Sequence, residues 1–319
     1  MSLVSVIIPN YNGLKYIKDT LNSIYDQTYD YIEVIIVDDG STDGSLEYLM
    51  SIDKVNVKVV RNPSQGACAA RNYGLRLSKG DYIQFLDNDD LLSRDKIASQ
   101  MHAISNDDRA IAVCNTSHFY ETIDTGVITD WDFLYTTDNP KEFLLNLYGA
   151  NGVQNMVQTS AWLAPRKLIE STEPWDETLS KDQDGEYFCR VVSRASQVIY
   201  VPEIINHYRK HVNGKNIANQ KQQKHIDSQL RALASKTKQF KGLEGSIAFK
   251  NAMALQYKII AIDAYPRFKV LSNKAMELSK QFGGSQYLPV LGGRIIEMIK
   301  IIFGWKAAKS FTTFVHKNH

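Results

Sequence analysis

Tyr82-Ile83-Gln84-Phe85-Leu86-Asp87-Asn88-Asp89-Asp90 joins a short strand-like run to four polar residues, three of which are acidic. Residues 82–86 predict a buried strand, and the acidic run begins where that strand ends. Carboxylates that repel one another at the mouth of an apolar sheet cost stability unless a cation or hydrogen-bond donors compensate them. A divalent cation with oxygen ligands, together with a diphosphate, is a natural compensator. Taken alone, an acidic run after a strand is most often a solvated turn.

Three more strands precede this one, and helices separate them. Apolar runs predict strands at residues 4–8, 31–37 and 55–60, and helical spacing of apolar residues predicts helices at 14–25, 44–50 and 67–77. Strands without polar alternation that alternate with helices imply a parallel sheet covered on both faces. We therefore predict an α/β fold whose ligands bind at the carboxyl ends of the strands.

The loops after these strands are rich in polar side chains. The second loop reads Asp38-Asp39-Gly40-Ser41-Thr42-Asp43, and the third leads to Arg71-Asn72 on a helix that faces the same edge of the sheet. Asp-Asp-Gly-Ser is also a common turn, and Asp43 is suited to cap a helix, so a purely structural role stays open. The convergence of four such loops on one edge favours a binding site.

Four segments together resemble family 2 glycosyltransferases. They match in order and spacing over roughly the first hundred residues, and they are Val6-Ile7-Ile8-Pro9-Asn10-Tyr11-Asn12, Val37-Asp38-Asp39-Gly40-Ser41-Thr42-Asp43, Ala70-Arg71-Asn72 and Phe85-Leu86-Asp87-Asn88-Asp89-Asp90. The resemblance implies the GT-A fold, which is a nucleotide-diphospho-sugar transferase fold with a mostly parallel sheet flanked by helices. It also implies a transfer with inversion at the sugar carbon.

The same resemblance assigns residues to the donor base. Pro9, Tyr11 and Asn12 would line the base pocket, and Asp39 would accept a hydrogen bond from the imide of the base. An imide is present in uracil and thymine, so the expected donor is a UDP-sugar or a dTDP-sugar.

The diphosphate end of the donor is assigned to the acidic run and its neighbours. The resemblance implies that Arg71 approaches the base or the diphosphate and that Asp87 lies near the ribose, with Asn88 also among the donor-binding residues. Asp89 would ligate a Mn²⁺ or Mg²⁺ ion that bridges the phosphates. In some family members the His of a Tyr-Arg-x-His element completes the metal shell, and His211 matches that position.

A catalytic base is expected in Lys181-Asp182-Gln183-Asp184-Gly185-Glu186-Tyr187-Phe188-Cys189-Arg190. The family pattern there is commonly Glu-Asp, an acidic residue two positions later and Arg six positions after the Asp. Asp184, Glu186 and Arg190 match this pattern, whereas Gln183 stands where Glu is common. We predict that Asp184 takes the proton of the acceptor hydroxyl, with Asp182 as the nearest alternative. Asp184 is also suited to cap the following helix, and Arg190 is expected to pair with a carboxylate structurally.

Three tryptophans could stack on a sugar face, namely Trp131, Trp162 and Trp175. Aromatic residues in a protein of this size more often belong to the core, so both interpretations stay open.

The motifs stop near residue 214, and the remaining sequence is helical in character. We therefore predict a catalytic domain at 1–214, with a nucleotide-sugar half at 1–110 and an acceptor half at 111–214, followed by a helical extension at 215–319. Residues 291–305 have the spacing of an amphipathic helix with a basic stripe. This helix, within 285–319, is expected either to lie on a membrane surface or to pack against the catalytic domain or a second subunit in a homodimer.

Composition narrows the class of protein. The net charge of +2 gives no reason to expect a nucleic-acid partner. The cysteines are widely spaced and odd in number, which fits packed thiols in a reducing compartment. No apolar run approaches the length of a membrane span, so we expect a cytoplasmic protein that is at most peripheral on the inner face of the plasma membrane.

The predicted function is metal-dependent transfer of a single sugar to a glycan or lipid-linked acceptor in cell-surface polysaccharide synthesis. Two alternatives remain. One is a catalytically inactive relative that binds sugar nucleotides, and the other is a nucleotidyltransferase, although no Gly-rich phosphate-binding loop follows the first strand.

Overall fold

The protein was analysed as a computed structural model that describes residues 1–105, 107–128, 132–211 and 222–315. Its chain forms two compact units, and each is described by itself. The first unit comprises residues 1–144, 157–178 and 183–216, and the second comprises residues 145–156, 179–182 and 217–319.

The N-terminal part of the first unit is a parallel sheet. Its strands lie in the order β3-β2-β1-β4, and all three pairings are parallel. The strands are β1 (Val4–Asn10), β2 (Ile32–Asp38), β3 (Val57–Arg61) and β4 (Tyr82–Phe85), and the helices between them are α1 (Ile17–Tyr25), α2 (Ser45–Met50) and α3 (Ala67–Leu77). Each predicted element of this half is therefore present, with ends that shift by a few residues.

Both faces of the parallel strands are buried, as their apolar runs predict. Val34 and Ile36 pack in one core cluster together with residues of α1, whereas Ile35 and Val37 pack against Ala70 of α3 on the opposite face. Because successive side chains of a strand alternate between faces, one β-branched run supplies both cores. The carboxyl ends of β1, β2 and β4 consequently open at the same edge of the sheet.

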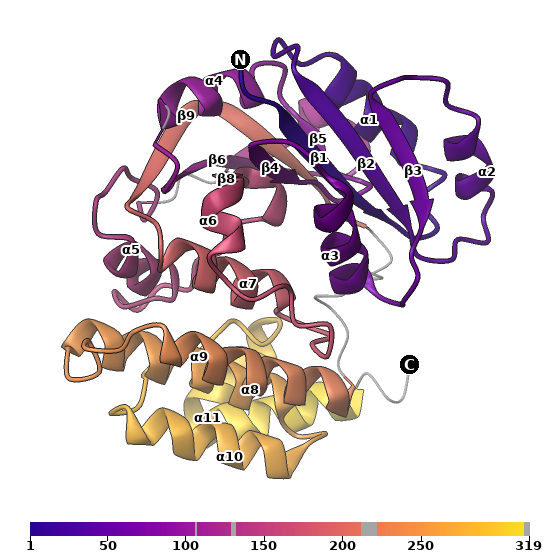
Figure 1. Cartoon of the computed structure of the whole chain (residues 1–319). Coiled ribbons are helices and arrows are strands. Elements are labelled where there is room, and N and C mark those ends of the chain that lie inside the picture. The colour runs from indigo at the N-terminus through magenta and orange to yellow at the C-terminus, as the bar shows by residue number, and fades with distance from the viewer. Residues whose placement is uncertain (106, 129–131, 212–221, 316–319) are drawn as a thin grey trace. The chain divides into compact units, whose positions relative to one another are not determined.

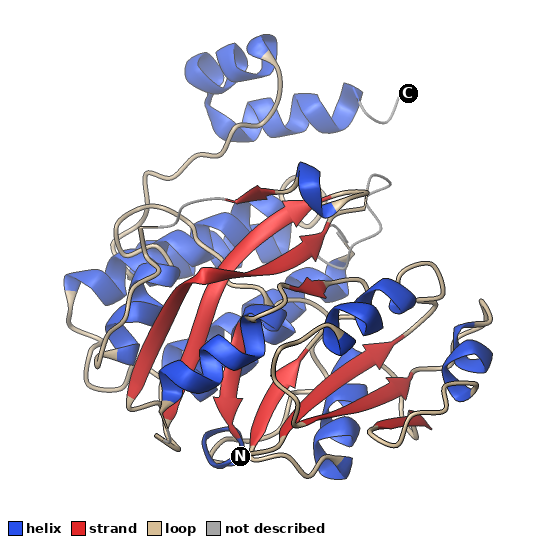
Figure 2. Ribbon diagram, turned by 90° about the horizontal axis from the view of Figure 1, so that it is seen from above, coloured by secondary structure: helices blue, strands red, loops and turns tan. Residues whose placement is uncertain are grey.

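The sheet continues beyond β4 with strands of mixed direction (Figure 2). β8 (Trp162–Pro165) pairs antiparallel with β4 and with β6 (Ala110–Phe119), and β6 pairs parallel with β9 (Gln197–Arg209). The short strands are β5 (Leu91–Leu92) and β7 (Val127–Ile128), and the remaining helices before the C-terminal group are α4 (Lys96–Ile104), α5 (Pro140–Leu147), α6 (Arg166–Glu170) and α7 (Gln183–Val192). The α/β prediction is confirmed, with parallel pairing concentrated in the N-terminal half.

The second unit is helical, as predicted. It contains α8 (Gln223–Lys238), α9 (Ile247–Ala264), α10 (Lys269–Gln281) and α11 (Arg294–Val315), which Figure 1 shows together. Two short stretches from earlier in the chain complete this unit. Tyr148 lies 6.3 Å from Phe240 between ring centroids, and Asp182 pairs with Lys236 of α8. The predicted domain boundary at 214/215 falls outside the described residues, so the division into 1–214 and 215–319 stays a prediction.

α11 bends at Gly304, whose φ of 82° lies in the left-handed region that a residue with a Cβ rarely adopts. Among the described helices, none combines the length and apolar content needed to cross a membrane.

Candidate active site

Asn10, at the end of β1, connects three of the polar loops. Its Nδ2 donates to Asp38 Oδ1 at 2.8 Å, and its Oδ1 accepts from Asn88 Nδ2 at 2.9 Å. The Asn10 side chain is fully buried, so these bonds replace its contacts with water. The loops after β1, β2 and β4 are thereby held together at one edge of the sheet.

The two carboxylates after β2 have different partners. Asp38 is buried and accepts from the backbone N–H groups of Gly40 and Ser41, so it shapes the turn. Asp39 is half-buried and accepts from Asn62 Nδ2 at 2.7 Å and from Gly66 N at 2.8 Å. Two carboxylate oxygens offer about four acceptor positions, so Asp39 retains capacity for an additional donor.

The residues predicted to surround the base lie next to Asp39. Pro9 pairs in register with Val37, and the Asp39 backbone N donates to Asn10 O at 2.8 Å. Tyr11 is 61% exposed, and Asn12 accepts from Thr42 N at 2.8 Å through its Oδ1. An exposed aromatic ring in the loop after β1 is suited to contact a planar base.

Arg71, on α3, pairs with Asp87 of the acidic run, with 2.6 Å between Nη2 and Oδ1. The guanidinium carbon lies 4.7 Å from the centroid of the Trp175 ring. Burial is the largest single influence and disfavours the guanidinium charge, but the neighbouring groups, Asp87 foremost among them, together raise the pKa of Arg71 above its ordinary value. The ion pair fixes the Asp87 carboxylate at the end of β4.

Asp90 is the last residue of the acidic run, and two hydrogen bonds from distant segments fix its carboxylate. Its carboxylate is buried, and it accepts from Ser160 Oγ at 3.0 Å and from Arg209 N at 3.1 Å. Burial, together with the charges of Asp89 and Asp87, raises the pKa of Asp90 well above its usual range. Arg209 also donates from Nε to Asp89 O at 3.0 Å, so β9 braces the turn that carries Asp89.

Asp89 and His211 are 122 positions apart in sequence, but their side chains are in contact. Asp89 Oδ2 lies 2.6 Å from His211 Nε2, and each side chain is 24% exposed. The predicted metal ligands are thus brought together at the carboxyl edge of the sheet.

A carboxylate is a suitable ligand for Mn²⁺ or Mg²⁺ when substrate phosphates and water supply the rest of the shell, whereas an imidazole suits a transition metal better than Mg²⁺. Within the described residues, no cluster of three or more His, Cys, Asp or Glu side chains forms a complete protein cage. The donor set therefore fits an ion that is shared with a diphosphate. Because Asp89 and His211 contact each other directly, binding the ion would require their side chains to separate.

Asp184 lies in the first turn of α7 and is half-buried, with Thr159 Oγ1 3.5 Å from its Oδ2. The helix begins at Gln183, so Asp184 is inside the helix rather than at the capping position. Asp184 also contributes to the raised pKa of Arg71, which means that the candidate base and the Arg71–Asp87 pair share one electrostatic environment. An accessible carboxylate on a rigid helix can accept a proton from a bound hydroxyl group.

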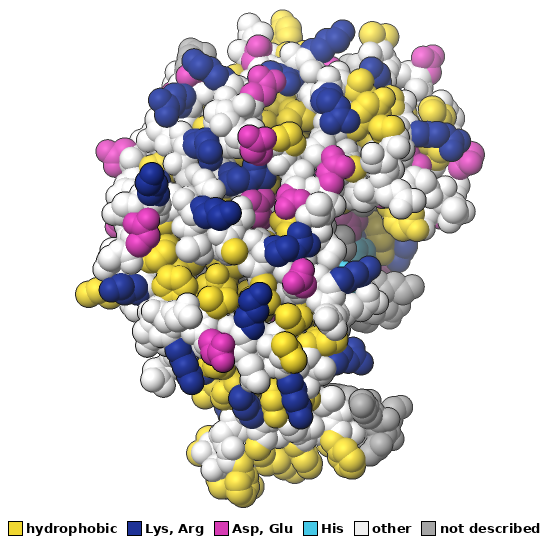
Figure 3. Space-filling model, turned by 60° about the horizontal axis from the view of Figure 1, so that its bottom comes forward, with side chains coloured by type: hydrophobic (Ala, Val, Ile, Leu, Met, Phe, Trp, Pro, Cys, Tyr) yellow, Lys and Arg dark blue, Asp and Glu magenta, His cyan; other side chains and the backbone are white. Residues whose placement is uncertain are grey.

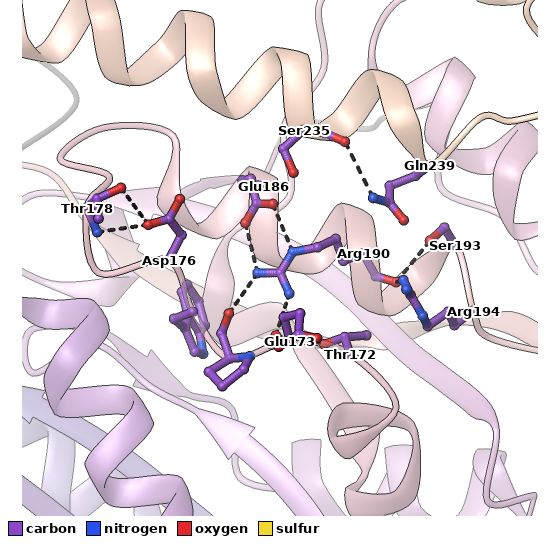
Figure 4. Close-up of polar contacts among 12 residues, drawn as sticks. Thr172, Glu173, Asp176, Thr178, Glu186, Arg190, Ser193, Arg194, Ser235 and Gln239 are labelled. Atoms are coloured by element: carbon purple, nitrogen blue, oxygen red, sulfur yellow. Dashed lines mark hydrogen bonds and ion pairs between the residues drawn. The ribbon is translucent and has the colours of Figure 1, made fainter.

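The residues that follow Asp184 fix α7 in place (Figure 4). Arg190 Nε lies 2.8 Å from Glu186 Oε1, and both side chains are less than 10% exposed. Arg190 also donates to the backbone oxygens of Glu173 and Pro174, which precede Trp175. The expectation that Arg190 is a structural partner of a carboxylate is therefore confirmed.

Asp182, the alternative base, has a different environment within the second unit. Both of its carboxylate oxygens accept from Lys236 Nζ at 2.7 Å, and the Lys236 side chain is 4% exposed. A carboxylate held by a buried ammonium is a weak proton acceptor. The contrast favours Asp184.

Gln183, where the family pattern commonly has Glu, accepts from the Cys68 thiol, with 3.2 Å between Sγ and Oε1. Burial raises the pKa of Cys68 to about 12, so the thiol keeps its proton and can donate it to this bond. Cys68 lies in the first turn of α3 and Gln183 begins α7, so the contact joins the helix of Arg71 to that of Asp184. All three cysteines are free and buried, as expected for packed thiols.

Trp162 and Trp175 do not face a ligand. Each is 2% exposed; Trp175 stacks on Tyr187 at 4.1 Å and Trp162 on Phe188 at 5.5 Å between ring centroids. Of the two interpretations that the sequence leaves open, the core one therefore holds for these two rings, because other aromatic side chains already cover them. Trp131 lies outside the described residues.

Several residues of the site were not identified from the sequence. Asn10, Asn62, Ser160 and Arg209 all bond to residues of the acidic loops, but only Asn10 and Arg209 lie within a motif. Ser160 and Arg209 are far from the acidic run in sequence. The sequence signal that could have indicated Asn10 is a polar residue directly after an apolar run that predicts a buried strand, because a buried polar side chain needs hydrogen-bond partners.

Comparison with known proteins identifies relatives of this chain. The family model described as "Glycosyl transferase family 2" matches residues 5–169, a range that contains the donor-side residues but neither Asp184 nor His211. EpsH of Bacillus subtilis, itself assigned to the glycosyltransferases, is 33% identical over 218 residues, which are 66% of this chain and 61% of EpsH.

A second relative is WfaP of Escherichia coli, named as a UDP-Glc:alpha-D-GlcNAc-diphosphoundecaprenol beta-1,3-glucosyltransferase. It is 37% identical over 130 residues, which are 40% of this chain and 52% of WfaP. The chain thus spans less than two thirds of the length of either relative.

Solved structures share the fold at low sequence identity. TarS residues 1–349 of S. aureus, in complex with UDP-GlcNAc, superpose with a TM-score of 0.61 at 17% identity over 90% of this chain and 94% of that one. The mannosyltransferase PcManGT of Pyrobaculum calidifontis, in complex with GDP-Man and Mn²⁺, has a TM-score of 0.53 at 17% identity over 97% and 84% of the two chains.

Proposed function

Since the chain belongs to glycosyl transferase family 2, we propose that it transfers a single sugar from a nucleotide-diphospho-sugar to a saccharide or lipid-linked saccharide acceptor, with inversion at the sugar carbon. The reaction would serve cell-surface polysaccharide synthesis. A UDP-sugar is the preferred donor, because Asp39 retains acceptor capacity for the imide of uracil.

The observation that carries this proposal is the contact between Asp89 and His211 at the edge where Asp39, Arg71 and Asp87 also lie. Ligands of parallel α/β sheets bind outside the carboxyl ends of the strands. An edge with a base-binding carboxylate at one loop and a cation-binding pair at another matches the two ends of a nucleoside diphosphate.

Asp184 is the proposed general base. It accepts the proton of the acceptor hydroxyl while that oxygen forms a bond to the anomeric carbon of the donor sugar. The bond between this carbon and the diphosphate oxygen breaks, and the leaving nucleoside diphosphate takes the electron pair. Thr159, which lies 3.5 Å from the Asp184 carboxylate, orients the base.

Asp89 and His211 are the proposed ligands of a divalent cation, Mn²⁺ or Mg²⁺. When bound, such an ion neutralises the charge that develops on the departing diphosphate. Arg209, which donates to Asp89 O, and Asp90, which accepts from Arg209 N, keep the Asp89 turn in position for this task.

The relatives support this choice of substrates. The name of WfaP specifies UDP-Glc as donor and a GlcNAc-diphosphoundecaprenol acceptor, which is consistent with a UDP-sugar and a lipid-linked acceptor here. PcManGT was solved with GDP-Man and Mn²⁺, so guanine-based donors belong among the compounds to be tested.

The experiment that tests the proposal measures nucleoside diphosphate release from a panel of UDP-, dTDP- and GDP-sugars with Mn²⁺, Mg²⁺ or EDTA. We expect release from a UDP-sugar that requires the divalent cation and an added saccharide acceptor. Asp89→Ala should remove the cation dependence of donor binding in calorimetry, because it deletes the carboxylate ligand.

Two results would contradict the proposal. Donor binding without release from any donor and acceptor pair would identify the chain as an inactive binding protein. Equal donor affinity of the wild type and Asp89→Ala with Mn²⁺ would exclude Asp89 as a ligand. Asp124→Ala, at an exposed residue of the short 3-10 helix Ile123–Thr125, serves as the control.

A further inference from the structure

The first half of α11 and the segment that precedes it expose a group of large apolar side chains. Residues from 288 to 303 contribute side chains that are between 43% and 82% exposed, namely Leu288, Val290, Ile295, Met298, Ile301, Ile302 and Phe303. Single exposed apolar residues are ordinary on protein surfaces, whereas a contiguous group marks an interaction site. We call these seven residues the apolar surface of α11.

Two charged residues of this helix segment, Glu297 and Lys300, bond within the segment. Glu297, the single acidic residue in the α11 sequence, accepts from Leu291 N at 2.7 Å and pairs with Lys300. Lys300 Nζ in turn donates to Pro289 O at 3.0 Å. These bonds fasten residues 288–292 to the helix and leave Ile295, Met298 and Ile302, which are spaced to share one helix face, directed outward.

The helix is anchored after its bend at Gly304. The Trp305 ring lies 5.4 Å from the Tyr265 ring at the end of α9, and Ala308 is buried. The residues before the bend therefore carry the apolar surface of α11, whereas residues after the bend pack against the end of α9 within the same unit. On the face seen in Figure 3, yellow side chains gather at the lower end of the molecule, with dark-blue Lys and Arg side chains nearby.

The C-terminal helices of the second unit contain many more basic than acidic residues. Residues 222–315 contain 15 Lys and Arg but only 5 Asp and Glu, which gives this segment a net charge of +10, although the whole chain carries +2. Such a segment is attracted to an anionic surface. It also repels a second copy of itself, so self-association through the same face is disfavoured.

From the exposed apolar side chains and the surrounding positive charge, we infer that the second unit binds an anionic lipid surface through α11. The apolar surface of α11 inserts into the boundary between headgroups and acyl chains, and Arg294 and Lys306, which are both exposed, face the lipid phosphates. The helix lies in the interface and does not cross it. This inference does not depend on the proposed sugar transfer, although it would keep the enzyme near a lipid-linked acceptor.

The test is vesicle flotation of the full chain with neutral phosphatidylcholine vesicles and with vesicles that also contain phosphatidylglycerol. We expect the wild type to float with the anionic vesicles and to be released by high salt. The double variant Ile301→Asp, Ile302→Asp should lower the bound fraction by about tenfold or more, because it places charges in the acyl boundary. Arg294→Gln with Lys306→Gln should weaken binding to the anionic vesicles alone.

The matched control is Val55→Asp, which changes a fully exposed apolar side chain on the first unit and should leave flotation unchanged. Ile301→Leu with Ile302→Leu should also retain binding. Thermal unfolding of each variant verifies that it is folded. Nucleoside diphosphate release with a water-soluble acceptor should be the same in all of these variants, which separates the lipid inference from the proposed transfer.

Several results would overturn the inference. They are absence of flotation by the wild type, equal flotation with neutral and anionic vesicles, and equal flotation of the Ile301→Asp, Ile302→Asp variant. Light scattering, which measures the oligomeric state, provides one further contradicting result. If the wild type is a dimer that does not bind vesicles, and the Ile301→Asp, Ile302→Asp variant is a monomer, then the apolar surface of α11 binds a second copy of the chain.

Discussion

Asp184 and Asp182 lie two residues apart, but their carboxylates have different electrostatic partners. Asp182 is held by the Lys236 ammonium at 2.7 Å, whereas Asp184 has a hydroxyl neighbour at 3.5 Å and is half-buried. Proximity in sequence therefore does not make the two residues equivalent, and the assignment of the base depends on which carboxylate can accept a proton.

The first prediction concerns this base. Asp184→Asn should lower kcat by about 10²–10⁴-fold, because the amide cannot take the hydroxyl proton. Donor affinity, measured by calorimetry, should remain near that of the wild type. Asp176→Asn, which changes an exposed carboxylate that accepts from Thr178 two residues later, is the control. Near-normal turnover of Asp184→Asn would move the base elsewhere.

The second prediction concerns the buried Lys96. Its side chain is fully buried, and its Nζ donates to Gln84 Oε1 at 2.5 Å and to Gln100 Oε1 at 2.6 Å. Neither acceptor is charged, so burial lowers the pKa of Lys96 from 10.5 to about 8. The unfolded chain then binds more protons than the native state between these two values.

The free-energy cost of the buried charge is consequently present in full below pH 8 and is relieved as the pH rises to 10.5. Relative to Lys96→Met, the wild type should gain unfolding free energy across this window. Thermal unfolding at a series of pH values measures the difference. Lys167→Met, at a side chain that is 70% exposed, should follow the wild type. A constant difference between the wild type and Lys96→Met would refute the prediction.

At the scale of elements, α7 and α8 each contain an acidic residue followed four positions later by arginine. Glu186 and Arg190 of α7 are buried, whereas Asp227 and Arg231 of α8 are about half exposed. The sequence spacing is the same, and the distances are similar at 2.8 and 3.1 Å. Burial is therefore the variable that separates the two pairs.

Glu186→Ala should destabilise the protein by about 3 kcal/mol, because it leaves the buried Arg190 charge without its carboxylate. Asp227→Ala should change the stability by less than about 0.5 kcal/mol, because water already screens that pair. Denaturant unfolding of both variants provides the measurement. Similar losses in the two variants would show that the burial of Arg190 has no energetic consequence.

At the scale of the whole molecule, the second unit is assembled from three separate stretches of chain. Residues 145–156 and 179–182 join the C-terminal helices within it. Ser228 Oγ of α8 accepts from Lys181 N at 3.0 Å, and Gln256 Nε2 of α9 donates to Tyr148 O at 3.0 Å. These stretches lose their packing partners if the C-terminal helices are removed.

A chain that ends at residue 211 should therefore lack a cooperative thermal transition, because Tyr148 and Asp182 lose the helices that contain Phe240 and Lys236. Scanning calorimetry and near-UV circular dichroism test this expectation against the full chain. A cooperative transition in the shortened chain would instead support the predicted boundary at 214/215 as that of an independent domain.

The parallel half of the sheet and its polar loops could be predicted from sequence for a local reason. Strand and helix periodicity is encoded within windows of about ten residues, and the carboxyl ends of parallel strands lie at one edge whatever the remaining structure is. Residues such as Asp39, Asp87 and Asp89 could thus be placed at that edge before any contact was known.

Only the tertiary structure shows which side chains bond to those carboxylates and which aromatic rings are exposed to a ligand rather than covered in the core. Arg209 reaches Asp89 and Asp90 across more than a hundred residues, Lys236 occupies Asp182, and Trp175 is covered by Tyr187. Such contacts depend on how distant segments pack, and burial and hydrogen-bond partners have no signature in a short window of sequence. Local sequence encodes the strands and helices of the parallel half and the sheet edge at which the candidate site lies. The packing of distant segments sets the partners of each charged group.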